Sequence, residues 1–177
     1  MAGGEHLTYS SFIERIVLSA HKLATHNSSP PCSTAILLAA GEGSRLGGLP
    51  KALIKVDGTS IMARQLKVLH EAGIAHVTVV TGHFHEQIEP ALTALSFLGM
   101  SIGLVRNAAP ERGQGSSVRL GMESILHQGQ QSADTNAVVV MLSDQPLVDA
   151  QDLTGLLDNF YHRAYGEVLI PYSNGDR

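Results

Sequence analysis

The chain of 177 residues contains a single cysteine, Cys32, and no tryptophan. One cysteine cannot form an intramolecular disulfide, and it excludes a zinc site that is built from several thiolates. The four phenylalanines and four tyrosines supply few rings on which the bases of a single-stranded nucleic acid could stack. Because 44% of the residues are hydrophobic, a chain of this length can still bury a core and fold as one ordinary globular domain.

Positive charge is scarce as well. Lysine and arginine number 12 against 16 aspartates and glutamates, so the net charge at pH 7 is −4 with histidine neutral. This balance lacks the basic surface of a general nucleic-acid or anionic-membrane binder, and we expect neither partner. No apolar run has the length of a membrane span, and the N-terminus lacks the pattern of a secretory signal. The sequence therefore predicts a cytoplasmic protein.

The N-terminal region, residues 1–33, is expected to be a helical extension followed by a linker. Its apolar residues recur at helical spacing: Phe12, Ile13, Ile16, Val17, Ala20, Leu23 and Ala24. Ser11 and Glu14 match a capping box at the start of such a helix. The polar, proline-containing stretch 27–31 is typical of a linker. We expect this helix to pack on the domain or on a second copy of the chain.

From residue 34 onward, short apolar runs alternate with amphipathic segments. The runs that predict strands are 34–39, 76–81, 101–106, 137–142 and 167–171. Helical periodicity predicts helices over 60–72, 86–98, 117–126 and 149–161, with Gly73 ending the first and Asp149 capping the last. Continuous rather than alternating apolarity is typical of strands that are covered on both faces. The order predicts an α/β fold with a doubly wound, mostly parallel sheet and helices on both faces.

Ligands of such sheets bind beyond the carboxyl ends of the strands, so the residues after each strand are the candidate site. The first strand runs into a segment rich in small residues, whose backbone amides can converge on an anion: Leu38, Ala39, Ala40, Gly41, Gly43 and Ser44. Arg45 and Lys51 then add a forked donor and a point charge, which suit a polyphosphate. A solvated loop is the structural alternative. The glycine spacing itself fits neither the dinucleotide-binding fingerprint nor a P-loop.

Polar or small residues follow the later strands too. Thr81, Gly82 and Asn107 end two strands beside the first loop, where they could contact a base or a ribose. Gly115, Ser116 and Ser117 open a helix, and the serines either cap it or hold a phosphate or a hydroxyl.

Asp144 follows a buried strand, where an isolated charge is costly unless it is bound to a cation. It suits Mg²⁺ bridged to phosphates, although a turn or cap aspartate before Pro146 is the structural alternative. His83 and His85 could suggest a metal pair, but no third ligand lies nearby in the sequence.

The run L-A-A-G-E-G-S-R-L-G followed by P-K resembles the signature of nucleotidyltransferases that activate sugars, isoprenoid precursors and pterins. With V-V-T-G-H, V-R-N, G-Q-G-S-S-V-R-L-G and L-S-D-Q-P-L in order, residues 34–177 resemble the MobA-like NTP transferase family. Within that family they look like the molybdenum cofactor cytidylyltransferases. The resemblance implies a Rossmann-like nucleotidyltransferase domain, and because relatives continue beyond the point that matches Arg177, we expect it to lack their C-terminal strands.

The resemblance implies transfer of a nucleoside monophosphate from an NTP to a phosphate-bearing acceptor, molybdopterin, with release of pyrophosphate. Arg45 would hold the β- and γ-phosphates, Lys51 would neutralise charge on the α-phosphoryl oxygens, and Asp144 would hold Mg²⁺. Thr81, Gly82 and Asn107 would help to read the nucleotide. L-A-A-G rather than L-A-G-G, and T-G-H after the second strand, favour CTP over GTP. A molybdoenzyme or its chaperone is a possible protein partner.

Three alternatives stay open. One is a GTP-dependent molybdopterin guanylyltransferase, and another is a non-catalytic relative that binds a nucleotide or carries the cofactor. The third is an NAD(P)-binding oxidoreductase domain. That fold needs a shorter glycine spacing and an acidic residue at the end of the second strand, where this chain has Thr81 and Gly82.

Overall fold

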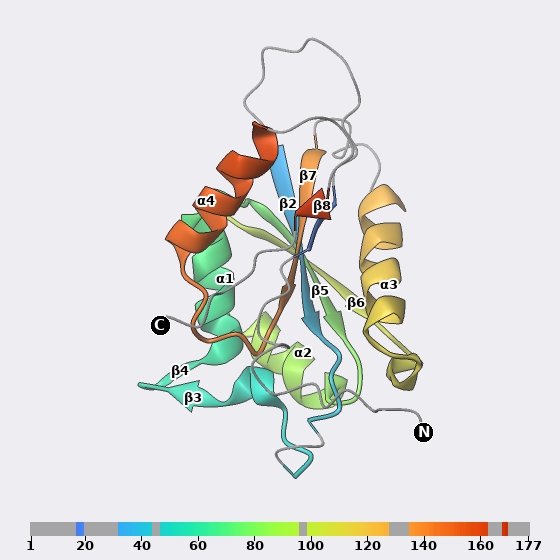
Figure 1. Ribbon diagram of the computed structural model, residues 1–177. Helices are drawn as coiled ribbons and strands as arrows, with labels where there is room; N and C mark the ends of the chain where they lie inside the picture. Colours follow the sequence, from blue (N-terminus) through green and yellow to red (C-terminus); the bar gives the residue numbers. More distant parts are fainter. Residues whose placement is uncertain are drawn as a thin grey trace, which may run out of the picture.

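A computed structural model describes residues 17–19, 32–43, 47–95, 99–127, 135–162 and 168–169 (Figure 1). The strands are β1 (Val17–Ser19), β2 (Cys32–Ala39), β3 (Lys55–Val56), β4 (Thr59–Ser60), β5 (His76–Thr81), β6 (Ser101–Arg106), β7 (Thr135–Leu142) and β8 (Val168–Leu169). The helices are α1 (Ile61–Glu71), α2 (His85–Thr93), α3 (Gln114–His127) and α4 (Ala150–Tyr161), with 3-10 turns η3 (Lys51–Leu53) and η4 (Pro110–Arg112).

The main sheet has the strand order β6-β5-β2-β7-β1-β8. Its first four strands are parallel, and the central strand β2 aligns Leu37 with Val79 of β5 on one side and Met141 of β7 on the other. The predicted mostly parallel α/β sheet is therefore confirmed. The carboxyl ends of all four parallel strands meet at one edge of the sheet, which is where a ligand is expected.

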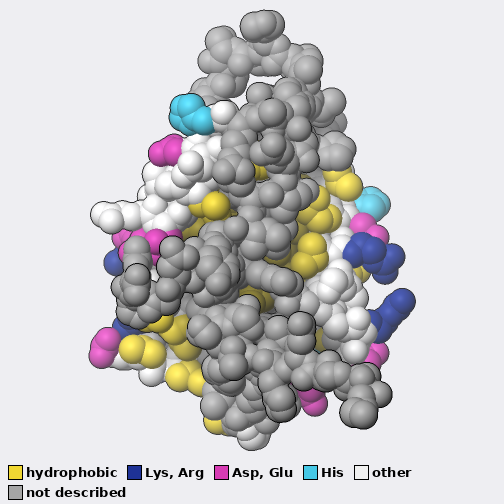
Figure 2. Space-filling view, viewed as in Figure 1, with side chains coloured by type: hydrophobic (Ala, Val, Ile, Leu, Met, Phe, Trp, Pro, Cys, Tyr) yellow, Lys and Arg dark blue, Asp and Glu magenta, His cyan; other side chains and the backbone are white. Residues whose placement is uncertain are grey.

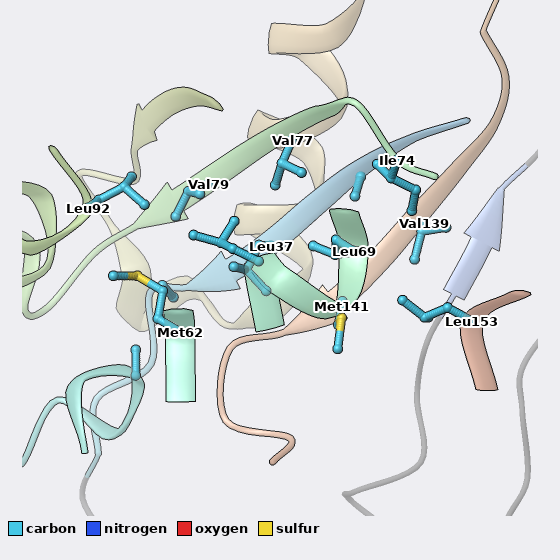
Figure 3. Packing of buried hydrophobic residues seen from close by; sticks show 14 of the residues in the cluster. Leu37, Met62, Leu69, Ile74, Val77, Val79, Leu92, Val139, Met141 and Leu153 are labelled. Carbon is cyan, nitrogen blue, oxygen red and sulfur yellow. The ribbon is translucent and has the colours of Figure 1, made fainter. Parts of the chain in front are cut away.

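Alternate residues of β2 face opposite layers of helices. Ala35, Leu37 and Ala39 pack with α1, α2 and α4, in a cluster that includes Met62, Leu69, Leu92 and Leu153 (Figure 3). Ile36 and Leu38 pack against residues of α3 on the other face. Figure 1 shows the same division, with α1 and α4 on one side of the sheet and α3 on the other. Helices on both faces explain why β2 is an unbroken apolar run from Ala35 to Ala39.

The prediction of an N-terminal helix is wrong at Val17–Ser19. These residues form β1, which pairs antiparallel with Val138–Val140 of β7, and the pairing satisfies backbone groups along that edge of β7. The rest of the predicted helix and the linker lie outside the described residues. The predicted strand over 167–171 is described only as β8, and it pairs antiparallel with β1 rather than with a parallel strand. The boundary between an extension and a domain at residues 33 and 34 stays a prediction.

Helix ends follow local signals where such signals exist. Ser60 caps α1, its Oγ accepting the amide of Ala63 at 3.2 Å, and Gly73 follows that helix with φ +83° as predicted. Asp149 caps α4 in a reciprocal capping box with Asp152. In contrast, α2 ends at Thr93 although its helical periodicity continues to residue 98.

The start of α3 and the hairpin of β3 and β4 differ from the sequence prediction. Helix α3 starts at Gln114, three residues before the predicted start, so Gly115, Ser116 and Ser117 lie in its first turns. The sequence pattern does not predict the hairpin of β3 and β4.

No helix within the described residues is long and apolar enough to cross a membrane. On the α3 side, Figure 2 shows basic and acidic side chains next to one another, and Arg119 and Glu123 of that helix form an ion pair at 3.7 Å.

Candidate functional site

A cleft of about 450 Å³ opens at the carboxyl ends of β2, β5 and β7, and Ile88 of α2 is among its lining residues. Figure 1 shows α2 beside these strand ends. The loop after β2, the start of η3, the turn after β5, the segment around η4 and the turn after β7 form its walls. Of the residues predicted from sequence, the following line it: Leu38, Ala39, Ala40, Gly41, Gly43, Lys51, Ser117 and Asp144. Thr81, Gly82, Asn107, Gly115 and Ser116 do not line it. Ser44 and Arg45 lie outside the described residues.

The loop after β2 contains one position that only glycine fits. Gly43 has φ +64°, and a Cβ built on it would lie 2.2 Å from the carbonyl oxygen of Leu49. The Gly43 carbonyl in turn accepts the Gly48 amide at 3.2 Å. This backbone contact closes the loop on itself and leaves small residues facing the cleft.

Lys51 and Asp144, which are 93 positions apart in sequence, form an ion pair across the cleft. The Lys51 Nζ lies 3.4 Å from the Asp144 Oδ2, and the two side chains are 26% and 38% exposed. Lys51 begins η3, and Asp144 lies in the turn after β7. A buried hydrogen bond from the Gln65 Nε2 of α1 to the Gln145 carbonyl, and one from the Ser143 amide to Leu38, hold that turn. The ammonium group of Lys51 and the carboxylate of Asp144 are thus held together in the cleft, beside the glycine-rich loop after β2.

Thr81 and Gly82 support the cleft wall from behind. The Thr81 hydroxyl is fully buried and donates to the Glu89 Oε1 at 2.8 Å. A Cβ on Gly82 would lie 2.8 Å from both the Cβ and the carbonyl oxygen of Ala40, so this glycine lets the end of β5 approach the loop after β2. Both residues therefore set the position of the loop instead of presenting a side chain to the cleft.

Glu89 joins this support to the neighbouring strand. Besides the Thr81 hydroxyl, it accepts hydrogen bonds from the Nε and Nη2 of Arg106 at 3.0 and 2.5 Å. The Arg106 guanidinium is the main reason that the pKa of Glu89 lies below its usual value, and the Thr81 hydroxyl also lowers it. The network fixes α2 against the ends of β5 and β6, and α2 contributes Ile88 to the cleft.

Asn107 lies behind the part of the cleft wall that the first turns of α3 form. It follows β6, is 4% exposed, and donates from Nδ2 to the hydroxyls of Ser116 and Ser117, each at 2.9 Å. Its Oδ1 accepts the Ala109 amide at 3.0 Å. Every hydrogen-bonding atom of the amide is therefore engaged within the protein, and only Ser117 of this group lines the cleft.

Several lining residues were not among the predicted site residues: Glu42, Pro50, Ala52, His83, Phe84, Ile88, Pro110, Glu111, Gly113, Gln114, Leu142 and Ser143. Glu42 and Gln114 stand inside motifs already singled out and could have been found from them. The His85 Nδ1 bonds the Gly82 carbonyl at 2.9 Å, and of these two histidines only His83 lines the cleft. Within the described residues, no group of three or more His, Cys, Asp or Glu side chains could hold a metal ion.

Known proteins resemble this chain over the region that contains the cleft. Residues 35–177 match the family described as the MobA-like NTP transferase domain. The bifunctional protein GlmU of Mycobacterium marinum (strain ATCC BAA-535 / M) is 33% identical over 126 residues, which are 70% of this chain and 24% of that protein. The chain thus spans about a quarter of the length of the curated relatives it matches.

Solved structures of two proteins share the fold. A nucleotidyl transferase from Methanothermobacter thermautotroptrophicus, Mth528, has a TM-score of 0.57 at 25% identity over 73% of this chain and 58% of its own. Rv0371c from Mycobacterium tuberculosis H37Rv has a TM-score of 0.55 at 25% identity over 73% of this chain and 60% of its own. A second structure of Rv0371c is a complex with manganese, with a TM-score of 0.50 at 23% identity over 72% and 58%.

Proposed function

Since the chain belongs to the MobA-like NTP transferase family, we propose that it transfers a nucleoside monophosphate from an NTP to a phosphate-bearing acceptor and releases pyrophosphate. The observation that carries the proposal is the ion pair of Lys51 and Asp144 in the cleft. It lies beside the loop after β2, in which position 43 accommodates only glycine. Small residues leave room for the nucleotide, and the lysine supplies positive charge for its phosphates.

The reaction is a displacement at the α-phosphorus. An oxygen of the acceptor phosphate bonds to that phosphorus, the bond from it to the oxygen bridging to the β-phosphate breaks, and pyrophosphate leaves. Lys51 neutralises the charge on the α-phosphoryl oxygens, and Arg45 holds the β- and γ-phosphates. Because the attacking phosphate is already ionised, no side chain has to act as a base. The protein contributes positioning and electrostatic stabilisation.

The residues at the cleft fit a divalent cation. Asp144 offers hard carboxylate oxygens, its Oδ1 makes no hydrogen bond to a described residue, and its Oδ2 holds only the exchangeable contact to Lys51. A single carboxylate completed by phosphate oxygens and waters is a usual magnesium arrangement. We assign Asp144 as the protein ligand of Mg²⁺, and the manganese complex of Rv0371c supports a divalent cation in this fold. When bound, the cation would neutralise phosphate charge.

CTP is the favoured nucleotide and molybdopterin the favoured acceptor. The support for CTP is the motif L-A-A-G at residues 38–41, together with T-G-H at residues 81–83. The support for molybdopterin is the resemblance of the ordered motifs to the molybdenum cofactor cytidylyltransferases. A guanylyltransferase acting on the same acceptor is the second candidate. A molybdoenzyme or its chaperone, as the protein that receives the product, stays a prediction from the family resemblance.

The test is pyrophosphate release and thermal stabilisation with CTP, GTP, UTP and ATP, each with Mg²⁺ and with molybdopterin or a hexose 1-phosphate as acceptor. We expect CTP to stabilise the protein most, and pyrophosphate release to require molybdopterin. An equal response to all four nucleotides would contradict the choice of CTP. Near wild-type release by both Lys51→Ala and Asp144→Ala would overturn the assignment of the site.

A further inference from the structure

The direction of each hydrogen bond around Asn107 can be assigned from the donors present. The Ala109 backbone amide is an obligatory donor, and it lies 3.0 Å from the Asn107 Oδ1. Turning the side-chain amide over would place its NH₂ group against that N–H. The orientation is therefore fixed, and the NH₂ group donates to both the Ser116 and the Ser117 hydroxyl oxygens.

Each serine oxygen accepts from Asn107, so each must use its own proton elsewhere. The Ser116 hydroxyl donates to the Gly113 carbonyl at 2.7 Å. The Ser117 hydroxyl makes no hydrogen bond to a described residue other than the one it accepts from Asn107. Ser117 is 3% exposed and lines the cleft, so its proton is left for a group inside the cleft. A buried hydroxyl proton without an acceptor is costly, which favours a ligand that provides one.

From this geometry we infer that Asn107 is a positioning residue that makes Ser117 a hydrogen-bond donor toward an acceptor atom of the bound nucleotide. The inference rests on the proposed function and differs from the sequence prediction that Asn107 itself contacts the nucleotide. The acceptor is a nucleoside oxygen or ring nitrogen, or a phosphate oxygen. A ligand group that can only donate a hydrogen bond does not fit opposite Ser117.

Substitution of Asn107 by aspartate tests the direction directly, because a carboxylate of the same shape can accept but cannot donate. In Asn107→Asp the Ser117 proton points back to the carboxylate, and only lone pairs face the ligand acceptor. We expect Ser117→Ala to weaken binding of Mg²⁺-CTP by about three- to tenfold, the effect of one lost neutral hydrogen bond. Asn107→Asp should weaken it at least as much, and adding Ser117→Ala to Asn107→Asp should change it less than about twofold.

Titration calorimetry with CTP and with inorganic triphosphate, both with Mg²⁺, measures these affinities and separates the two sources of the acceptor. A loss shared by both ligands places the acceptor on the phosphates, and a loss seen with CTP alone places it on the nucleoside. Thr154→Ala is the matched control, since it also removes a helix hydroxyl, one bonded to the Ala150 carbonyl at 2.7 Å and outside the cleft. It should leave both affinities unchanged.

Thermal unfolding of each variant separates folding from binding. If Asn107→Asp does not fold, Ser117→Cys takes its place, because a thiol is a weak donor of similar size. This variant should show the same loss of nucleotide affinity as Ser117→Ala. Wild-type affinity in both Ser117→Ala and Ser117→Cys would overturn the inference while leaving the proposed function intact. A stronger, additive loss in the double variant would overturn it as well. Failure of the wild-type protein to bind any nucleotide would overturn the proposed function, and this inference with it.

Discussion

Substitution of Asp144 by asparagine should change nucleotide affinity in opposite directions with and without a divalent cation. The Asp144 Oδ2 lies 3.4 Å from the Lys51 Nζ. Without a divalent cation, a triphosphate must compete with this carboxylate for the ammonium group and is also repelled by it. Removal of the negative charge, with the size of the side chain kept, should therefore tighten binding under these conditions.

The size of the gain follows from the geometry of the pair. Two unit charges at this separation interact by about 1 kcal/mol in bulk water, and exposed pairs measured in proteins contribute about 0.2–1 kcal/mol. With side chains 26% and 38% exposed, the pair belongs near the upper end of that range. We therefore expect Asp144→Asn to bind CTP about two- to fivefold more tightly in EDTA. With Mg²⁺ the same variant lacks a ligand to the cation, and pyrophosphate release should fall by about a hundredfold or more.

Calorimetric titration of CTP into both proteins, in EDTA and in Mg²⁺, measures the change of sign. Lys51→Met is the companion variant, because it should weaken binding in both conditions. Combined with Asp144→Asn, it should remove the gain seen in EDTA. A loss of equal size in EDTA and in Mg²⁺, or a gain that persists without the lysine, would refute the reasoning.

Two further predictions concern the support behind the cleft. The Arg106 guanidinium lowers the pKa of Glu89 below 4.5, so the ionised carboxylate stabilises the fold above that pH and the stabilisation is lost as pH falls through the folded-state pKa. The difference in thermal midpoint between the wild type and Glu89→Gln should be largest at neutral pH and shrink below pH 4.5; a difference that grows on acidification would contradict this. Gly82→Ala should destabilise the protein by about 1–3 kcal/mol in urea unfolding, because the new Cβ meets the Ala40 backbone. Gly155→Ala in α4, where a Cβ meets nothing within 4 Å, should be neutral or stabilising, and equal losses in both variants would sink the steric argument.

The central parallel strands β2, β5 and β7 could be predicted because consecutive residues in each are buried, one toward each face of the sheet. Ala35, Ile36 and Leu37 are each fully buried, which is why β2 reads as an unbroken apolar run. Val17–Ser19 carries no comparable signal, because its pairing with β7 depends on an open sheet edge far along the chain. The hairpin of β3 and β4 has the turn sequence Asp57-Gly58, but its strands of two residues are too short for a pattern to register.

The position of the site could be predicted from the order of the strands, whereas the direction of its side chains could not. Lys51 and Asp144 meet because both follow parallel strands at the same edge of the sheet. Thr81 and Asn107 also end strands at that edge, yet their side chains bond Glu89 and the two serines instead of facing the cleft. The sequence does not reveal these partners, because they lie on α2 and α3 and are set by how each helix packs on the sheet.

The supporting side chains share one physical feature, which explains why motif residues and lining residues differ. Thr81, Asn107 and Gln65 are each at most 4% exposed, and each bonds a residue that lines or flanks the cleft. A buried polar group that loses its partner costs about 1–3 kcal/mol. Replacing any of them therefore strains both the fold and the position of the wall in front. The partner in the wall therefore constrains the residue type behind it, so a motif at this edge marks the support of the site as well as its surface.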